Sequence, residues 1–336
     1  MKGKTYLILY HIEDNDGLFS CAIMKNYLIN TLKIDESHII TKGHTYKSLD
    51  HLYDEIKNDL GGFKSRFNNI IMTDISFDDY HSMIALSKCY GKHFTWIDHH
   101  APIIKESIKN KFDDINGLRD ISHSALMNMW RYLYDPLDEK FKNGNIPTIF
   151  KYLSGWDSWS YKYWNLTLDQ VRYFNTGITN KYDLDLDIIC KLVYMVIYEN
   201  SIGNNPEYIR MINDYGKNIC DYEDKKYDNL ISVFGDFDWK LKIDENTYRK
   251  CCAIFIQAAT NSLMFRKAKG KSDNGLVFKK NKNGGWVLSL YNINNEDTFD
   301  CGSFLKEKYN GGGHIGAAGA TITDNQFIDM INKKEI

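Results

Sequence analysis

Asp98, His99 and His100 follow one another directly and bring a carboxylate and two imidazoles into one short stretch. The largely apolar residues 93–97 just before them predict a buried strand that ends in a loop. In open α/β sheets, ligand-binding groups gather at the ends of strands. Carboxylates and imidazoles suit Mn²⁺ or Mg²⁺ better than a thiolate zinc site would. The alternative for this stretch alone is a capping aspartate followed by two solvated histidines.

A second acidic loop follows the apolar run at residues 5–10. It contains His11, Asp14 and Asp16, and Gly17 then permits a tight turn into residues 18–28, whose periodicity is helical. Asp14 and Asp16 alternate, so both can point the same way from an extended loop. The alternative here is again a capping aspartate with surface neighbours.

Strands and helices in alternation must position these groups. Apolar runs at residues 37–41 and 69–73 predict two more buried strands, and helices are expected at residues 49–60 and 78–89. Asp74 directly follows the run at 69–73, so three strands of one parallel sheet would end in acids. Carboxylates cluster at high cost unless a cation neutralises them, which favours a metal site over capping for the set.

The middle of the chain is predicted to be mainly helical, at residues 122–130, 170–176, 187–199 and 207–222, with Ser122 or Ser124 as the first N-cap. Asp157 lies between Trp156 and Trp159. Taken alone, this spacing favours a buried acid bonded to an indole N–H or to a backbone amide.

The last hundred residues predict strands at 239–243 and 251–256, a short helix at 261–267, a hairpin of 275–280 with 286–291, and a helix at 301–309. A run rich in glycine and alanine follows at 310–320. Its glycines allow close approach to a ligand, and the small residues after His314 are expected to start a helix whose N-terminal amides face an anion. A flexible loop is the alternative, although the density of small residues favours close packing.

Length and composition define the class of protein. The 336 residues predict two domains, which we place at 1–200 and 233–336 with a helical linker at 201–232. The expected fold class is α/β: a doubly wound, mainly parallel N-terminal domain, a smaller C-terminal α/β domain, and the active site in the cleft between them. A net charge of −2 argues against tight binding of long nucleic acid.

The seven cysteines include no CxxC pair, which predicts reduced thiols in the cytoplasm. Cys251 and Cys252 lie in an apolar run and are expected to be buried in a strand. No apolar run is long enough for a signal peptide or a membrane span.

Taken together, these motifs resemble those of the DHH-family phosphoesterases. The resemblance spans roughly residues 5–320, and its five motifs occur in the family's order: Asp14-Asn15-Asp16-Gly17, Asp74, Asp98-His99-His100, Asp157, and Gly311-Gly312-Gly313-His314 followed by Ala317-Ala318-Gly319. The last is similar to the signature of the DHH-associated C-terminal domain and points to the nanoRNase and RecJ-like branch. The sequence departs from the family pattern at two points. The spacing from His11 to Asp14 is one that varies among family members, and Tyr309-Asn310 precede the glycine motif where a fourth glycine is expected.

The resemblance implies two divalent ions, Mn²⁺ first and Mg²⁺ second. One ion would be bound by His11, Asp14 and Asp74, and the other by Asp16, Asp74, His99 and Asp157. Asp98, His99 and His100 would be catalytic, with His100 near the scissile phosphate. The substrate-binding residues would be His100 together with Gly311, Gly312, Gly313 and His314, which would bind a second phosphate.

The activity so implied is hydrolysis of short oligonucleotides (nanoRNA or linear dinucleotides) to nucleoside monophosphates. The alternatives are a RecJ-like single-strand DNA exonuclease, for which a long basic groove is expected, and a non-catalytic nucleotide or RNA sensor, for which loss of an acidic ligand is expected. We expect a monomer or homodimer in the cytoplasm of a bacterium, or encoded by a phage and acting in its host.

Overall fold

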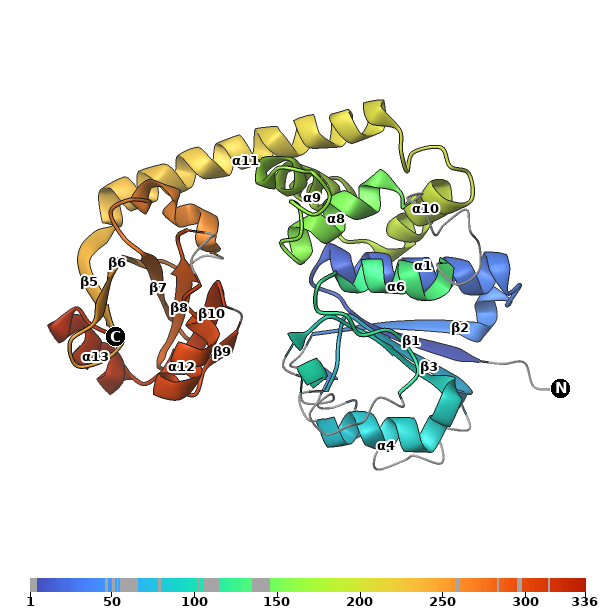
Figure 1. The fold of residues 1–336 in the computed structure, drawn as a ribbon, viewed down its shortest axis with the longest axis horizontal. Coiled ribbons are helices and arrows are strands. Elements are labelled where there is room, and N and C mark those ends of the chain that lie inside the picture. Colours follow the sequence, from blue (N-terminus) through green and yellow to red (C-terminus); the bar gives the residue numbers. More distant parts are fainter. Residues whose placement is uncertain are drawn as a thin grey trace. The chain divides into compact units, whose positions relative to one another are not determined.

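The computed structural model of the chain describes residues 5–45, 48–49, 52, 54, 66–77, 80–101, 103–105, 115–134, 146–257, 260–282, 284–294, 298–313 and 315–336. The chain divides into two compact units, Met1–Ile219 and Cys220–Ile336 (Figure 1). Most of the helix predicted at 49–60, and His314 of the glycine-rich motif, lie outside the described residues.

Unit 1 is built on a four-stranded parallel sheet in the order β2-β1-β3-β4. The strands are β1 (Tyr6–His11), β2 (Ile39–His44), β3 (Asn69–Thr73) and β4 (Phe94–Ile97). The central strands are almost entirely buried because both faces of the sheet are covered, which is why their sequences are continuously apolar. The predicted parallel α/β sheet is therefore confirmed.

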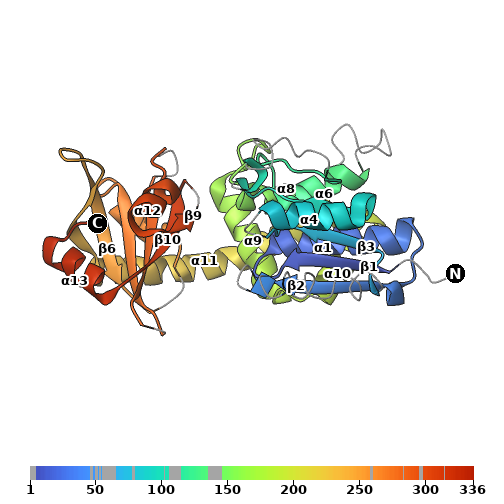
Figure 2. The same cartoon turned by 90° about the horizontal axis from the view of Figure 1, so that it is seen from below.

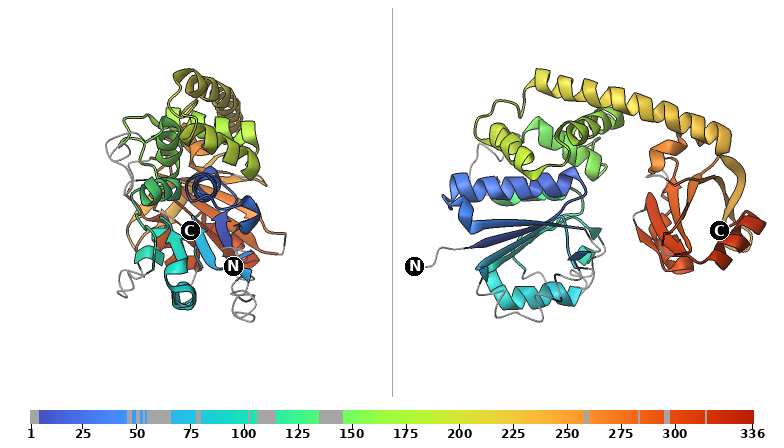
Figure 3. Two further views of the ribbon diagram at one scale, coloured as in Figure 1. Left: turned by 90° about the vertical axis from the view of Figure 1, so that its right-hand side faces the viewer. Right: turned by 180° about the vertical axis from the view of Figure 1, so that it is seen from behind.

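Two helical layers cover the sheet, as Figure 3 shows from behind. Ile8 and Tyr10 of β1 pack into the core beneath α1, whereas Leu7 and Leu9 pack into the opposite core with α4. The first layer contains α1 (Asn15–Asn26), α6 (Ala125–Tyr134), α8 (Thr148–Asp157), α9 (Leu168–Tyr182) and α10 (Leu186–Ile197), and the second contains α4 (Tyr80–Tyr90). Short helical turns lie at Tyr27–Thr31, Glu36–His38 and Gly91–His93.

The strand order reverses between β1 and β3. From β1 the chain passes through α1 to β2 on one side, whereas β3 lies on the other side of β1. At such a switch point the loops after two neighbouring strands diverge and leave a crevice outside their carboxyl ends, where ligands bind in open α/β sheets. The acidic loops after β1, β3 and β4 all meet at this edge.

Gly17 is required where the chain turns from β1 into α1. A Cβ atom at this position would lie 2.0 Å from the carbonyl oxygen of His11. We expect Gly17→Ala to lower the free energy of unfolding by about 3 kcal/mol, because the backbone that carries His11 must move. Urea denaturation measures the effect. Gly316→Ala is the control, because nothing lies within 4 Å of its added Cβ; an equal midpoint for the two variants would contradict the close approach.

Unit 2 has a six-stranded mixed sheet in the order β5-β6-β7-β8-β10-β9, in which only β6 and β7 pair in parallel. The strands are β5 (Asp236–Lys242), β6 (Tyr248–Phe255), β7 (Asn274–Lys280), β8 (Trp286–Asn292), β9 (Gly312–Gly313) and β10 (Ala317–Ile322). The helix α11 (Pro206–Phe234) runs through most of the stretch predicted to be a linker. The predicted hairpin is confirmed as β7 and β8.

Helices lie against the sheet of unit 2 (Figure 2), and a hydrophobic core is packed on each of its faces. One is formed with α12 (Cys301–Tyr309) and α13 (Asp324–Lys333), and the other with the 3₁₀ helix Ser262–Ala268 and the end of α11. Cys251 and Cys252 are fully buried in β6, as predicted, and all seven cysteines are free thiols. Among the described residues no helix combines the length and apolar character needed to cross a membrane.

The prediction of a helix after His314 was wrong. Residues Ala317–Ile322 form β10, which pairs with β8 on one side and with β9 on the other. Small residues are needed there because a Cβ at Gly311 would lie 2.4 Å from the carbonyl oxygen of Gly319. The described residues of this glycine and alanine run therefore form two closely packed strands, β9 and β10, and not the N-terminus of a helix.

Candidate metal centre

Seven of the polar side chains predicted from the sequence converge at the carboxyl edge of the unit 1 sheet. Neighbouring strands deliver most of them, because β1 pairs with β3 and β3 with β4 in parallel register. A helix end delivers the last, since α8 ends at Asp157. The converging residues are His11, Asp14 and Asp16 after β1, Asp74 after β3, His99 and His100 after β4, and Asp157.

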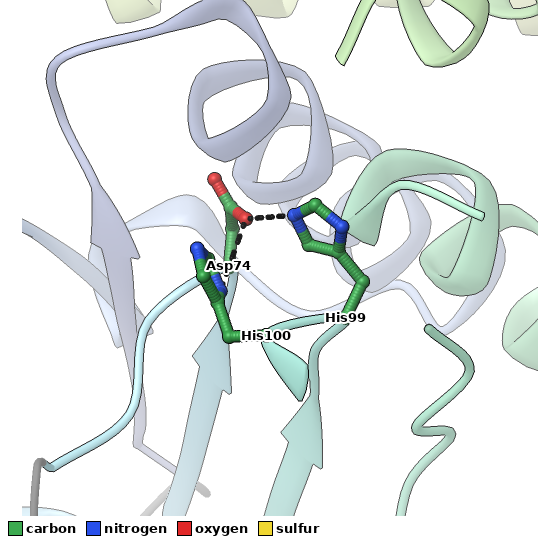
Figure 4. Close-up of side chains that lie close together, drawn as sticks. All are labelled: Asp74, His99 and His100. Atoms are coloured by element: carbon green, nitrogen blue, oxygen red, sulfur yellow. Dashed lines mark ion pairs between the residues drawn. The ribbon is translucent and has the colours of Figure 1, made fainter. Parts of the chain in front are cut away.

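Asp74 links several members of this cluster, and Figure 4 shows its carboxylate facing His99 and His100. Its Oδ2 is 3.7 Å from Nδ1 of His11, and that same nitrogen is 3.0 Å from Oδ2 of Asp14. Its Oδ1 is 3.3 Å from Nε2 of His99 and 4.0 Å from Nδ1 of His100. A positive φ of 57° at Asp74 turns the chain sharply as β3 ends. One carboxylate thus faces imidazoles on both sides.

His99 connects Asp74 to the other two acids. Its Nε2 lies 3.6 Å from Oδ2 of Asp16 and 3.4 Å from Oδ2 of Asp157. The sequence alone favoured an indole or amide partner for Asp157, but its buried Oδ2 accepts no hydrogen bond. The packing of α8 therefore directs this oxygen toward His99.

Among the described residues, three groups have ligand atoms within 4.8 Å of one another: His11–Asp14–Asp74, Asp16–His99–Asp157 and Asp74–His99–His100. Asp74 and His99 each belong to two of these groups, so the groups are adjacent. Both carboxylate oxygens of Asp74 are buried and accept no hydrogen bond within the described part of the chain. Buried carboxylate oxygens without donors, surrounded by further oxygens and imidazole nitrogens, fit a divalent cation such as Mn²⁺.

The electrostatics of the cluster point the same way. Burial raises the pKa of Asp74 well above its ordinary value, and the charges of Asp16 and Asp14 raise it further. Burial, and then the charge of Asp16, likewise raise the pKa of Asp157. Burial alone would lower the pKa of His11, but the hydrogen bond with Asp14 and the negative charges of Asp14 and Asp74 outweigh it and raise that pKa to about 11. The site therefore gathers four acids in a buried setting, which favours binding of a cation.

Two of the acids are held by helix N-termini. Asp14 caps α1, with its Oδ1 accepting a hydrogen bond of 3.0 Å from the backbone N–H of Gly17. Asp16 accepts hydrogen bonds from the backbone N–H groups of Ala125 (2.7 Å) and Leu126 (2.9 Å) at the start of α6. The sequence predicted Ser122 or Ser124 as the cap of this helix; instead a carboxylate more than a hundred residues away satisfies these donors, and the Ser124 hydroxyl has no partner.

Asp98 lies behind the cluster. Its side chain is fully buried, and its Oδ1 accepts hydrogen bonds from the backbone N–H of His99 (2.7 Å) and from Nδ1 of His100 (2.7 Å). Its Oδ2 accepts one from the indole of Trp96 at 3.1 Å. Burial would raise the pKa of Asp98, but the charge and hydrogen bond of His100 outweigh it and lower that pKa to about 2. Asp98 thus fixes the ring of His100 and the backbone of His99 from behind the cluster.

For the phosphodiester hydrolysis that the sequence resemblance implies, Asp98→Asn is expected to lower kcat/KM about 10- to 100-fold while the protein still folds, since partners that orient metal-binding histidines contribute effects of this size in other proteins. The asparagine cannot accept all of these hydrogen bonds, so the ring of His100 loses its fixed orientation. Steady-state kinetics with Mn²⁺ measures the change. Asp35→Asn is the control, because Asp35 accepts a backbone N–H in an exposed loop; equal activity of both variants would contradict the positioning role.

Asn128 is a residue that the sequence analysis missed. It is fully buried in α6, and its Nδ2 donates to the backbone carbonyls of Asp98 (3.1 Å) and Asp120 (2.9 Å). It thereby ties the loop after β4 to the helix that binds Asp16. An asparagine within the otherwise apolar run Ala125–Trp130 was the signal that could have identified it.

The glycines of the predicted phosphate-binding motif belong to unit 2. Gly312 and Gly313 form β9 and are exposed, and Gly313 has a φ of 145°. Gly311 follows Asn310, whose left-handed backbone ends α12. His314 is outside the described residues, so the structure describes only the three glycines of this motif.

Comparison with known proteins identifies the fold. No protein-family model matches the sequence, and no curated protein matches it. The structure of PggH, a pGpG-specific phosphodiesterase from Vibrio cholerae, aligns with 98% of this chain and 97% of its own, at 13% identity and a TM-score of 0.50. RecJ from Thermus thermophilus, in complex with Mn²⁺, aligns with 99% of this chain but 52% of its own, at 11% identity and a TM-score of 0.52. The chain therefore has the fold of these proteins and spans about half of RecJ.

Proposed function

We propose that this protein is a DHH-family phosphodiesterase that uses two divalent cations to hydrolyse short oligonucleotides and linear dinucleotides to nucleoside monophosphates. The observation that carries the proposal is the pair of ligand groups joined through Asp74 and His99 at the switch point of the sheet. The fold shared with a pGpG-specific phosphodiesterase and with RecJ supports it.

The residues divide between two adjacent cation sites. His11, Asp14 and Asp74 would bind one cation, and Asp16, His99, Asp157 and Asp74 the other, so that Asp74 bridges them. When bound, the two cations would lower the pKa of a water molecule and offset negative charge on the phosphate. The carboxylates are anchored before any cation arrives, because helix N-termini hold Asp14 and Asp16.

His100 is the residue that we assign to the phosphate. Burial would lower the pKa of its imidazole, but the charge and hydrogen bond of Asp98 outweigh it and raise that pKa. A protonated imidazole beside the cluster would donate a hydrogen bond to a non-bridging phosphate oxygen. Because Nδ1 is engaged by Asp98, we assign this contact to Nε2.

A short substrate suits the charge of the protein. The net charge of −2 would not concentrate a long polyanion, whereas one or two phosphates need only the cations and a few donors. Gly311, Gly312, Gly313 and His314 are proposed to bind a second phosphate through backbone N–H groups and the imidazole. A RecJ-like exonuclease acting on single-stranded DNA is the second candidate, and the fold shared with RecJ favours it.

One assay separates these candidates. The purified protein is incubated with Mn²⁺ and 5′-labelled RNA of two, five and twenty-four nucleotides, together with matching DNA, and the products are resolved over time. Rapid loss of the dimer and pentamer with the long RNA spared supports the proposed function. Progressive shortening of long DNA would favour the exonuclease. Tight dinucleotide binding without any cleavage would favour a non-catalytic nucleotide sensor and contradict the proposal.

A further inference from the structure

A loop rich in aromatic residues directly follows Asp157 of the candidate metal centre, and none of the roles proposed above involves it. It joins α8 to α9 at residues 158–167 and includes Trp159, Tyr161, Tyr163 and Trp164. Backbone hydrogen bonds hold its shape, from Tyr163 N–H to the Ser160 carbonyl at 2.9 Å and from Leu166 N–H to the Tyr161 carbonyl at 3.0 Å. The aromatic rings are therefore presented from an ordered turn.

The rings form two clusters. Trp156 and Trp159 lie with their ring centroids 5.8 Å apart and their planes 31° from parallel. The ring of His123 lies 5.4 Å from Tyr163 and 5.9 Å from Trp164, and these last two meet edge to face at 4.6 Å. Each cluster therefore fixes the orientation of one ring that projects into solvent.

Both clusters begin next to groups of the metal centre. Trp156 directly precedes Asp157, whose Oδ2 faces His99. His123 lies two residues before Ala125, whose N–H binds Asp16. The loop that carries the aromatic rings therefore follows one of the four acids directly, and His123, against which Tyr163 and Trp164 pack, lies close in sequence to the N–H group that binds a second acid.

Packing within unit 1 leaves much of these rings uncovered. The exposed fraction is 46% for Trp159 and 67% for Tyr163, whereas Trp130 in α6 is 1% exposed. Trp159 also has a φ of 55°, a backbone conformation that bulky residues rarely adopt. Exposed aromatic faces beside a polar site provide a surface on which a planar group can stack.

We propose that Trp159 and Tyr163 form a stacking platform for the bases of the nucleotides whose phosphate binds at the metal centre. This inference rests on the proposed function, since it names how that site would recognise its substrate. Every base has a π-face, so such a platform accepts any sequence and adds affinity that a free phosphate lacks. It also distinguishes nucleotides from other phosphate esters.

The test compares diadenylate with an abasic dinucleotide that has the same sugar–phosphate backbone. For Trp159→Ala, kcat/KM for diadenylate is expected to fall about 5- to 150-fold further than kcat/KM for the abasic compound, the range found when a stacking aromatic is replaced by alanine. Tyr163→Ala should show the same selective loss of kcat/KM for diadenylate. Trp159→Phe should keep most of the wild-type kcat/KM because phenylalanine still stacks.

Tyr194→Ala provides the matched control. Tyr194 is 38% exposed on α10 and stacks on Tyr198, whose hydroxyl donates to the Asn26 carbonyl at the far end of α1 from Asp14. This variant should leave the ratio of the two kcat/KM values unchanged. A Trp159→Ala and a Tyr163→Ala that both behave like Tyr194→Ala would overturn the platform while leaving the proposed function intact.

A binding measurement makes the two proposals separable. Equilibrium dialysis of labelled diadenylate with EDTA-treated protein involves no turnover, and the Kd should rise in Trp159→Ala and recover in Trp159→Phe. If the wild type hydrolyses neither compound but the Kd still rises in Trp159→Ala and recovers in Trp159→Phe, the platform stands and the hydrolase assignment fails. If the Kd is equal in all three proteins, the platform fails whatever the activity.

Discussion

Asp74→Asn is expected to abolish hydrolysis while the protein remains folded. Asp74 belongs to both proposed cation sites, because one of its carboxylate oxygens faces His11 and the other faces His99. Asparagine has nearly the same shape but carries no charge and offers one oxygen in place of two. We expect kcat/KM to fall at least about 1000-fold, because loss of a single electrostatic donor already costs 100- to 1000-fold in other enzymes.

The same substitution should stabilise the metal-free protein at neutral pH. Burial and the neighbouring acids raise the pKa of Asp74 in the folded state, so ionisation of this group opposes folding. The protonated carboxyl of Asp74 contributes its full stability below the pKa that Asp74 has in the unfolded chain. This contribution is lost as the pH rises toward the higher pKa that Asp74 has in the folded protein. The stability advantage of Asp74→Asn over the wild type should therefore widen between pH 4 and pH 7.

Steady-state kinetics with Mn²⁺ and urea denaturation in EDTA measure the two effects. Asp169→Asn is the control, because Asp169 is an exposed acid in the first turn of α9. It should leave both activity and stability close to those of the wild type. Turnover by Asp74→Asn within tenfold of the wild-type rate would contradict the assignment of Asp74 as the shared ligand.

The sequence was sufficient to predict the strands that deliver the site. Residues such as Leu7–Tyr10 and Ile70–Met72 are continuously apolar because both faces of a parallel sheet are covered, and acids follow directly where the strands leave the core. Parallel pairing then places His11, Asp74 and His99 at one edge, whatever the details of the surrounding helices. Local pattern and topology were enough for this part.

The partners of Asp157 and Asp16, and the conformation after His314, depend on tertiary packing and could not be predicted from the sequence. Asp157 has a local sequence that suits a buried structural acid, and only the placement of α8 directs its Oδ2 to His99. The partners of Asp16 are backbone N–H groups at Ala125 and Leu126, which any residue type can supply, so the sequence contains no signal for them. The small residues after His314 suit a helix or a strand, and pairing with β8 selects the strand.

Removal of divalent cations is expected to eliminate turnover and to lower thermal stability. Without cations the carboxylates of Asp14, Asp16, Asp74 and Asp157 repel one another across a few ångströms, and burial adds to that cost. An ion present at one hundred times its Kd stabilises the folded state by about 2.7 kcal/mol. For a unit of about 200 residues this corresponds to a rise in Tm of roughly 5–10 °C per ion.

Differential scanning calorimetry in EDTA and then in excess Mn²⁺ measures this shift, and labelled diadenylate follows the return of activity. Mn²⁺ should be more effective than Mg²⁺, because imidazole ligands at His11 and His99 suit the softer ion. Asp74→Asn should lose most of the shift, since it removes a ligand from both sites, whereas Asp169→Asn should keep it. A Tm that rises equally in Asp74→Asn and the wild type would mean that the cations bind elsewhere, because Asp74 is the one carboxylate that both proposed sites require.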